Sequence, residues 1–350
     1  MVIFSHGRHV MGIHLPAVLE TFWGYTGGMG VQVFFGLSGY LITHLLIREL
    51  NLSGRISLRD FYIRRTLRIF PALYVYLAVI GLLTFYGVLQ VPLRDFVAAA
   101  TFTINYVQGD AMGARWFVGH THSLAIEEQF YLFWPLIFCF CGLARSKKIA
   151  LALVVMMPLI RVASYFLLPE SRTTIGVTMH TCADRLMFGC LLALLEGNPW
   201  FERILQRLNS AIFPIFAVVF LLGVQPLLVT HLQGAYVLPL GLSLEGLLIA
   251  FIIAWLMRNV SSPASRFLNL RSISAVGVFS YSLYLWQQPF VTELNTTISG
   301  KAPWCFVFAI ACAVISYFFI EKPVLALRKR FRSNGTKQVG PQNHIPATGR

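Results

Sequence analysis

Apolar stretches long enough to cross a membrane recur along the whole sequence, and they constrain the fold more than any other feature. A membrane-spanning helix needs about 20 predominantly apolar residues. After a short apolar start, the stretches near this length are 30–47, 69–88, 127–143, 149–168, 184–197, 211–230, 238–257, 273–294 and 304–321. Charged residues make up 12% of the chain, about half the usual share in soluble domains. The sequence therefore predicts an all-α, polytopic transmembrane helical bundle.

The distribution of positive charge indicates how the spans are oriented. Lys and Arg accumulate in cytoplasmic loops. Of the 28 basic residues, 21 lie in five segments that we expect to be cytoplasmic: 48–68, 144–148, 198–210, 258–272 and 322–350. This asymmetry favours about ten crossings, provided that the moderately apolar segment 94–107 stays outside. The first crossing is expected to be truncated, because the starting residues MVIFS are too few for a span.

These features predict one membrane-embedded domain, residues 1–330, followed by a disordered cytoplasmic tail, residues 331–350. The net charge of +14 suits anionic lipid headgroups, so we expect a lipid bilayer as a partner and no nucleic acid. The six cysteines lack the spacing of a zinc site, and we expect no metal. The expected location is the plasma membrane or cell inner membrane.

The motif FYIRRTLRIFPALYV, residues 61–75, brings three arginines to the start of an apolar segment. On a helix Arg64 and Arg68 share a face, as do Arg65 and Arg68. Guanidinium groups match the geometry of phosphate. The cluster either marks the cytoplasmic end of a span or binds an anion, and spacing alone leaves both interpretations open.

A second motif, HSLAIEEQFYLFWP at residues 122–135, places Glu127 and Glu128 at the start of an apolar helix, with Ser123 upstream as a plausible N-cap. Charged groups inside spans are costly and usually functional. A carboxylate near a helix N-terminus also has a purely structural explanation, because it complements the helix dipole. Both interpretations stay open for the two glutamates.

Histidines near the start of the chain are the candidates for proton transfer. His6, in FSHGRHVMG, ends an apolar segment, where a histidine can act as a general base near neutral pH. His9 and His14 lie close to it, so spacing alone prefers none of the three. A structural role is the simpler alternative for each.

The motifs occur in an order that strongly resembles acyltransferase family 3, a family of integral-membrane carbohydrate O-acyltransferases. They are GVQVFFGLSGYLIT (30–43), DFYIRRTLRIFP (60–71), HSLAIEEQFYLFWP (122–135), CADRLMFGCLLALL (182–195), FSYSLYLWQQP (279–289) and IEKP (320–323). The resemblance extends from about residue 1 to residue 330. It implies ten helices, acyl-CoA (acetyl-CoA above all) as the donor, and O-acylation of an extracytoplasmic carbohydrate such as lipopolysaccharide O-antigen or an exopolysaccharide.

The resemblance also implies roles for the polar residues. His6 resembles the family's catalytic histidine. Arg65 and Arg68 match its Arg-x-x-Arg pair, associated with acyl-CoA, and Arg64 stands beside them as a further candidate. Glu127 matches the glutamate of the Ser-Leu-x-x-Glu motif, where it would orient the histidine.

Substrate contacts are expected from the serine of that motif, Ser123, and from a signature of the second helix that includes Ser38 and Tyr40. Three positions depart from the family pattern: His122 stands where tryptophan is favoured, Cys182 where arginine is frequent, and Gln287 where histidine is common. A fourth departure is that the family's basic residue upstream of the catalytic histidine falls before the first residue of this sequence.

The residues alone permit a second class of function, a secondary transporter that uses buried His, Arg and Glu side chains for an anionic or sugar substrate. The lack of an internal repeat and the position of the arginines at a loop boundary count against it. Consumption of a thioester would separate the two classes.

Overall fold

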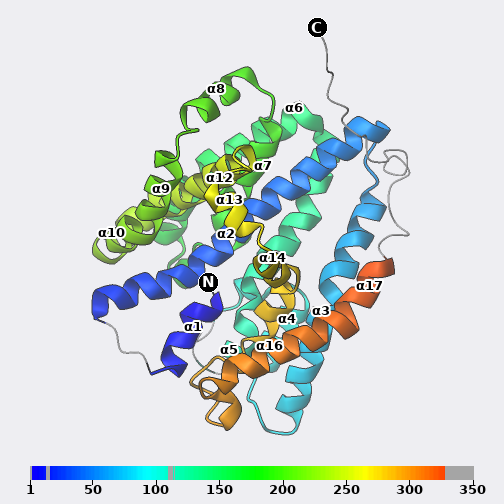
Figure 1. Cartoon of the computed structure of the whole chain (residues 1–350), viewed down its shortest axis with the longest axis vertical. Helices are drawn as coiled ribbons and strands as arrows, with labels where there is room; N and C mark the ends of the chain where they lie inside the picture. The colour runs from blue at the N-terminus through cyan, green and yellow to red at the C-terminus, as the bar shows by residue number, and fades with distance from the viewer. Residues whose placement is uncertain (1, 13–15, 109–112, 114, 328–350) are drawn as a thin grey trace.

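A computed structural model describes residues 2–12, 16–108, 113 and 115–327, and within them the chain is helical with no strand (Figure 1). The prediction of an all-α fold is confirmed. The helices are α1 (Val2–Val10), α2 (Ala17–Ser53), α3 (Leu58–Phe85), α4 (Leu93–Ala100), α5 (Trp116–Gly119), α6 (Thr121–Leu167), α7 (Met179–Leu194), α8 (Pro199–Arg207), α9 (Ile212–Val219), α10 (Gln225–Leu232), α11 (Gly234–Tyr236), α12 (Leu242–Arg258), α13 (Pro263–Leu268), α14 (Arg271–Val278), α15 (Ser280–Trp286), α16 (Trp304–Ser316) and α17 (Lys322–Leu327).

Short turns of other helix types connect several of these elements. The 3₁₀ turns are η1 (Ile104–Tyr106), η2 (Pro169–Thr174) and η5 (Ile298–Gly300), and the π-helical turns are η3 (Phe220–Val224), η4 (Val237–Gly241) and η6 (Tyr317–Glu321). The π-helical turns join α9 to α10, α11 to α12 and α16 to α17, so each of these pairs forms one longer helical segment.

Seven helical segments of the described chain are long and apolar enough to cross a membrane. They are Phe22–Ser53, Leu58–Phe85, Trp116–Leu167, Pro169–Leu194, Ile212–Leu232, Gly234–Arg258 and Trp304–Leu327. The prediction of about ten spans is therefore not confirmed. The predicted tail, residues 331–350, lies outside the described residues.

Two local features account for most of the difference in number. The predicted spans 127–143 and 149–168 lie in two helices that meet at Gly142 (φ 72°, ψ 173°), where the backbone bends without a loop, so together they count as one segment, Trp116–Leu167. A positive φ of this kind suits glycine. The predicted span 273–294 is broken into the short helices α14 and α15, followed by turns. Segment 94–107 holds only α4 and η1, which are too short to cross, as predicted.

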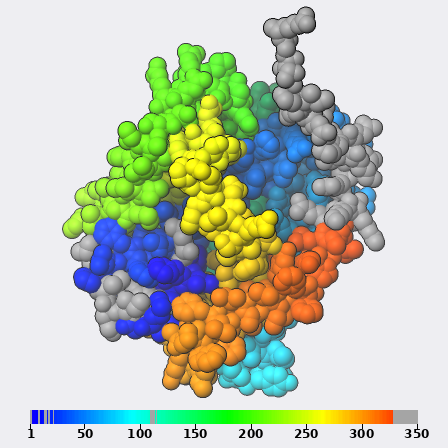
Figure 2. Space-filling view, in the orientation of Figure 1, coloured from blue at the N-terminus to red at the C-terminus, as the bar shows by residue number. Residues whose placement is uncertain are grey.

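Large apolar side chains cover the outside of the bundle. Phe85, Phe140, Phe319 and Leu167 are 82%, 80%, 77% and 76% exposed. Figure 2 shows α13 and α14 (yellow) on the surface between the green helices α8–α10 and the orange helices α16 and α17. Exposed apolar surface of this extent marks a membrane or partner interface rather than a surface facing water, so it agrees with a multi-pass membrane protein.

Helices α2 and α7 approach each other closely near the centre of the bundle (Figure 1). A Cβ atom added at Gly39 would lie 2.0 Å from the carbonyl oxygen of Leu186, and one at Gly189 would lie 2.1 Å from that of Gly36. Only glycine allows backbones to come this near, as in other membrane helix pairs. The contact fixes α2 against α7, and both helices line the site described next.

Candidate functional site

A cavity of about 520 Å³ opens among α1, α2, α5, the start of α6, η2 and α7, and three histidines line it: His6, His120 and His122. We call it the histidine cavity. Two arginines, Arg115 and Arg185, belong to the same lining. In the described part of the chain no three His, Cys, Asp or Glu side chains are arranged to hold a metal ion.

His6 reaches this cavity because α1 is held against α2. The indole Nε1 of Trp23 donates to the carbonyl oxygen of Phe4 (2.8 Å), and the two rings stack with centroids 4.2 Å apart. The centroid of the His6 ring lies 4.9 Å from the centroid of the Trp116 ring. His14 lies outside the described residues, and His9 belongs to α1 but its side chain is not described.

Sequence reasoning did not select His120, yet it is the most deeply placed of the three histidines. It is 7% exposed, and neither ring nitrogen has a hydrogen-bond partner among the described residues. Its ring meets the edges of Tyr76 and Tyr284, with centroids 5.5 and 5.3 Å away. His122 differs, because its Nδ1 lies 3.0 Å from the carbonyl oxygen of Gly119. The available signal was that His120 stands two residues before His122, the first residue of the glutamate motif.

A second cavity, of about 340 Å³, lies among α1, α2, α6, α14 and α15, and Glu127 lines it. We call it the glutamate cavity. Tyr284 lines both cavities, as do Val2 and Val31, so these side chains form a partition between them. Ser123 also lines the glutamate cavity, and its Oγ lies 2.7 Å from Oη of Tyr284.

Tyr131 connects three of the residues predicted from the sequence, although it was not itself predicted. Its hydroxyl donates to Oε2 of Glu127 (3.1 Å) and lies 2.9 Å from Oγ of Ser38. The Arg65 guanidinium stacks over its ring, 5.1 Å from the centroid. Tyr131 stands four residues after Glu127, so both lie on one helix face. That spacing was the signal available in the sequence.

The three arginines of the 61–75 motif do not act as one surface. Arg64 Nη2 pairs with Oε2 of Glu49 on α2 at 3.3 Å. Arg65 and Arg68 are both close enough to Glu127 to interact with it electrostatically. The structure therefore brings Arg65 and Arg68 to the glutamate site, and Arg64 is bound to α2.

Three expectations need correction or a new place. Helix α6 begins at Thr121, so Ser123 lies inside the helix and is not its N-cap. The first turn of α6 contains no acidic residue, and Glu127 and Glu128 lie beyond it. The explanation that they complement the helix dipole was therefore wrong. Tyr40 lines neither cavity; it stacks on His44, with ring centroids 5.5 Å apart, and packs in the apolar cluster between α2 and α7.

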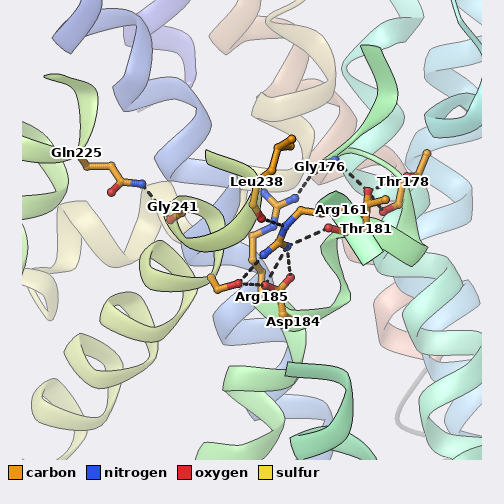
Figure 3. Close-up of polar contacts among 10 residues, drawn as sticks. Arg161, Gly176, Thr178, Thr181, Asp184, Arg185, Gln225, Leu238 and Gly241 are labelled. Atoms are coloured by element: carbon orange, nitrogen blue, oxygen red, sulfur yellow. Dashed lines mark hydrogen bonds and ion pairs between the residues drawn. The ribbon is translucent and has the colours of Figure 1, made fainter. Parts of the chain in front are cut away.

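A buried ion pair supports the wall of the histidine cavity (Figure 3). The Nη1 of Arg161 on α6 lies 3.0 Å from both carboxylate oxygens of Asp184 on α7, and both side chains are fully buried. Arg161 also donates to the carbonyl oxygens of Leu238 (2.8 Å) and Thr181 (3.0 Å). The network joins α6, α7 and η4, and it fixes the position of the next residue, Arg185. Sequence reasoning assigned Arg161 and Arg185 only to spans.

Comparisons with known proteins indicate the family of this chain. A family model described as an acyltransferase domain matches residues 1–320. The peptidoglycan O-acetyltransferase OatA of Listeria monocytogenes is 29% identical over 86% of this chain and 52% of its own. The O-acetyltransferase OatA of Staphylococcus aureus is 30% identical over 87% of this chain and 54% of its own. The chain thus spans about half the length of the curated relatives it matches. No solved structure matches it.

Proposed function

The chain belongs to acyltransferase family 3, and on that premise we propose that it is a membrane O-acetyltransferase that moves an acetyl group from cytoplasmic acyl-CoA to a hydroxyl of an extracytoplasmic carbohydrate. The relatives are named as O-acetyltransferases, and one as acting on peptidoglycan. The acceptor class therefore includes peptidoglycan beside the O-antigen and exopolysaccharide expected from the sequence.

The observation that carries the proposal is the placement of two cavities on either side of Tyr284, one lined by the three histidines and the other by Glu127, which interacts electrostatically with Arg65 and Arg68. Positions along helix α2 show how far the histidine cavity lies from the arginine motif. Phe35 is its last residue to line the histidine cavity, whereas Glu49 pairs with Arg64. At ~1.5 Å per residue these two positions are about 21 Å apart along the helix. Because Arg65 follows Arg64 directly, we assign the donor to the Glu49 end of α2 and the acceptor to the other end.

On the donor side, Arg65 and Arg68 would hold the CoA phosphates through charge-assisted hydrogen bonds. The glutamate cavity is lined largely by apolar side chains such as Phe34, Leu37 and Leu124, which suits the thioester arm. Because Glu127 bonds to Tyr131 and lines this cavity, we assign it to positioning the donor rather than to orienting His6. Ser38 contacts the same Tyr131 hydroxyl group, so we assign it to the donor site as well.

On the acceptor side, His6 would act as the base. It takes the proton of the attacking hydroxyl as the new C–O bond forms at the thioester carbon. The C–S bond then breaks, CoA leaves as a thiolate, and the thiolate takes up a proton. Proton transfer to a placed base contributes about 10²–10⁴-fold to the rate. His6 and Trp116 share the cavity lining with His120, so the acceptor would be enclosed by rings on several sides.

The test is CoA release by the purified chain in nanodiscs, followed with a thiol reagent, using acetyl-CoA and a cell-envelope saccharide. We expect saccharide-dependent release, a loss of about 10²–10⁴-fold in His6→Gln, and unchanged acetyl-CoA binding in that variant. His44→Gln is the matched control, since His44 contacts Tyr40 and Glu196 away from both cavities. Near-parental turnover in His6→Gln would refute the assignment. Saccharide transport without thioester consumption would instead support the transporter class.

A further inference from the structure

The charged side chains that line the histidine cavity are all basic. Among the described residues of the lining, these are Arg115 and Arg185, accompanied by the three histidines, with no Asp or Glu. A cavity whose fixed charges have one sign attracts ligands of the opposite sign, because low-dielectric walls concentrate the field. The lining therefore favours a ligand that carries negative charge.

Arg185 has unused capacity to bind such a ligand. Its side chain is 3% exposed, its Nη2 donates to the carbonyl oxygen of Gly176, and its Nε has no hydrogen-bond partner among the described residues. Its guanidinium lies 5.7 Å from the ring centroid of Phe35, which also lines the cavity. A buried donor without a partner is costly, and an anion in the cavity would satisfy it.

Neighbouring carboxylates do not remove this capacity. Asp184, the residue before Arg185, has both carboxylate oxygens within 3.0 Å of Arg161 (Figure 3). Glu245 on α12 interacts electrostatically with Arg185, but it does not belong to the described lining of the cavity. No carboxylate therefore stands beside Arg185 in the described lining of the cavity.

The histidines extend the same surface. His122 lies close enough to both Arg115 and Arg185 to experience their positive charges. His120 is 7% exposed and has two ring nitrogens without partners among the described residues. A neutral imidazole offers one donor and one acceptor, so His120 can bind a sugar hydroxyl next to an anionic group held by Arg185.

We propose that the histidine cavity binds a sugar bearing an anionic group, either a carboxylate or a phosphate, through Arg185 together with His122 and Arg115. Calling this sugar the acceptor rests on the function proposed above; the anion site itself does not. A sugar acid and the phosphate of a glycosyl phosphate present the same charge to a guanidinium group, and the experiment below separates them.

The experiment measures binding by calorimetry to the full chain in nanodiscs, without acyl-CoA. The probes are glucuronate and glucose 1-phosphate, each compared with glucose. We expect at least one anionic probe to bind about tenfold or more tightly than glucose, as one hydrogen bond to a charged group would give. The preferred probe identifies the anionic group.

A variant at Gly28 tests the location without removing any buried side chain. Gly28 lies on α2 in the cavity lining, and a Cβ atom there would meet nothing within 4 Å. Gly28→Asp adds a negative charge to the cavity, and Gly28→Asn adds the same shape without the charge. We expect Gly28→Asp to abolish the preference for the anionic probe and Gly28→Asn to keep it.

The Arg185→Gln variant should also lose the preference for the anionic probe. The Arg172→Gln variant should keep it, because Arg172 lies outside the cavity lining.

Three results would overturn the proposal: no preference for either anionic probe over glucose, equal binding by Gly28→Asp and Gly28→Asn, or a preference that survives in a folded Arg185→Gln variant. None of them depends on turnover. An unaltered chain that prefers the anionic probe but transfers no acetyl group would therefore contradict the proposed function alone. An unaltered chain that transfers the acetyl group without that preference would contradict the anion site alone.

Discussion

Oγ of Ser123 lies 2.7 Å from Oη of Tyr284, and the Tyr284 hydroxyl in turn donates to the carbonyl oxygen of His120. This contact joins α6 to α15 at the partition between the glutamate and histidine cavities. It fixes the backbone of the histidine that sequence reasoning did not select. The partition is where the two substrates of the proposed reaction would meet.

The first prediction concerns this partition. Tyr284→Phe removes the hydroxyl group. Two buried groups then lose a hydrogen-bond partner: Oγ of Ser123 and the carbonyl oxygen of His120. We expect turnover to fall by about tenfold or more, which corresponds to one lost buried hydrogen bond, while the affinity for acetyl-CoA is retained. Steady-state CoA release and acetyl-CoA titration measure the two effects. Tyr74→Phe, which loses an exposed bond to Ala100, is the control and should retain parental turnover.

The second prediction concerns the donor side. Tyr131→Phe removes the hydroxyl that bonds to both Ser38 and Glu127, and unsatisfied buried groups cost about 1–3 kcal/mol each. We expect weaker acetyl-CoA binding and a lower melting temperature. Tyr62→Phe is the control, because Tyr62 bonds to the same helix α6 at an exposed site, the carbonyl oxygen of Leu132. Equal acetyl-CoA affinity in both variants would exclude Tyr131 from the donor site.

The third prediction concerns the close contact of α2 and α7. Gly39→Ala places a methyl group 2.0 Å from the carbonyl oxygen of Leu186, so the helices must move apart. Overpacking of this kind costs about 1–3 kcal/mol or more, and we expect a clear drop in melting temperature. Gly24→Ala on the same helix meets nothing within 4 Å and should leave the melting temperature unchanged or slightly higher. A stable Gly39→Ala variant would contradict the contact.

The fourth prediction concerns the buried ion pair. Arg161→Met leaves Asp184 buried without its partner, which should cost about 3–5 kcal/mol. The double variant Arg161→Met/Asp184→Leu removes both charges and should recover much of that loss. The control is Arg258→Met, which breaks a pair with Glu202 whose side chains are 33% and 30% exposed and should cost about 0–1 kcal/mol. Equal unfolding free energies for Arg161→Met and Arg258→Met would contradict the role of the buried pair.

Much of the fold followed from the lengths of the apolar stretches, because length and hydrophobicity decide whether a helix can span a bilayer. The kink at Gly142 and the break between α14 and α15 did not, because they depend on backbone conformation and packing. The motif residues Arg65 and Glu127 converged on Tyr131. The roles of His120 and Arg185 emerged only from contacts between helices distant in sequence.

In the proposed reaction donor and acceptor enter from opposite ends of the bundle, and transfer across a sealed membrane is the decisive measurement of this arrangement. The chain is reconstituted into proteoliposomes in one known orientation, with labelled acetyl-CoA on one side and saccharide on the other. We predict labelled saccharide only when acetyl-CoA is on the side of Arg65 and saccharide on the side of His6. Product formed when both are supplied to the Arg65 side alone would contradict entry from opposite ends.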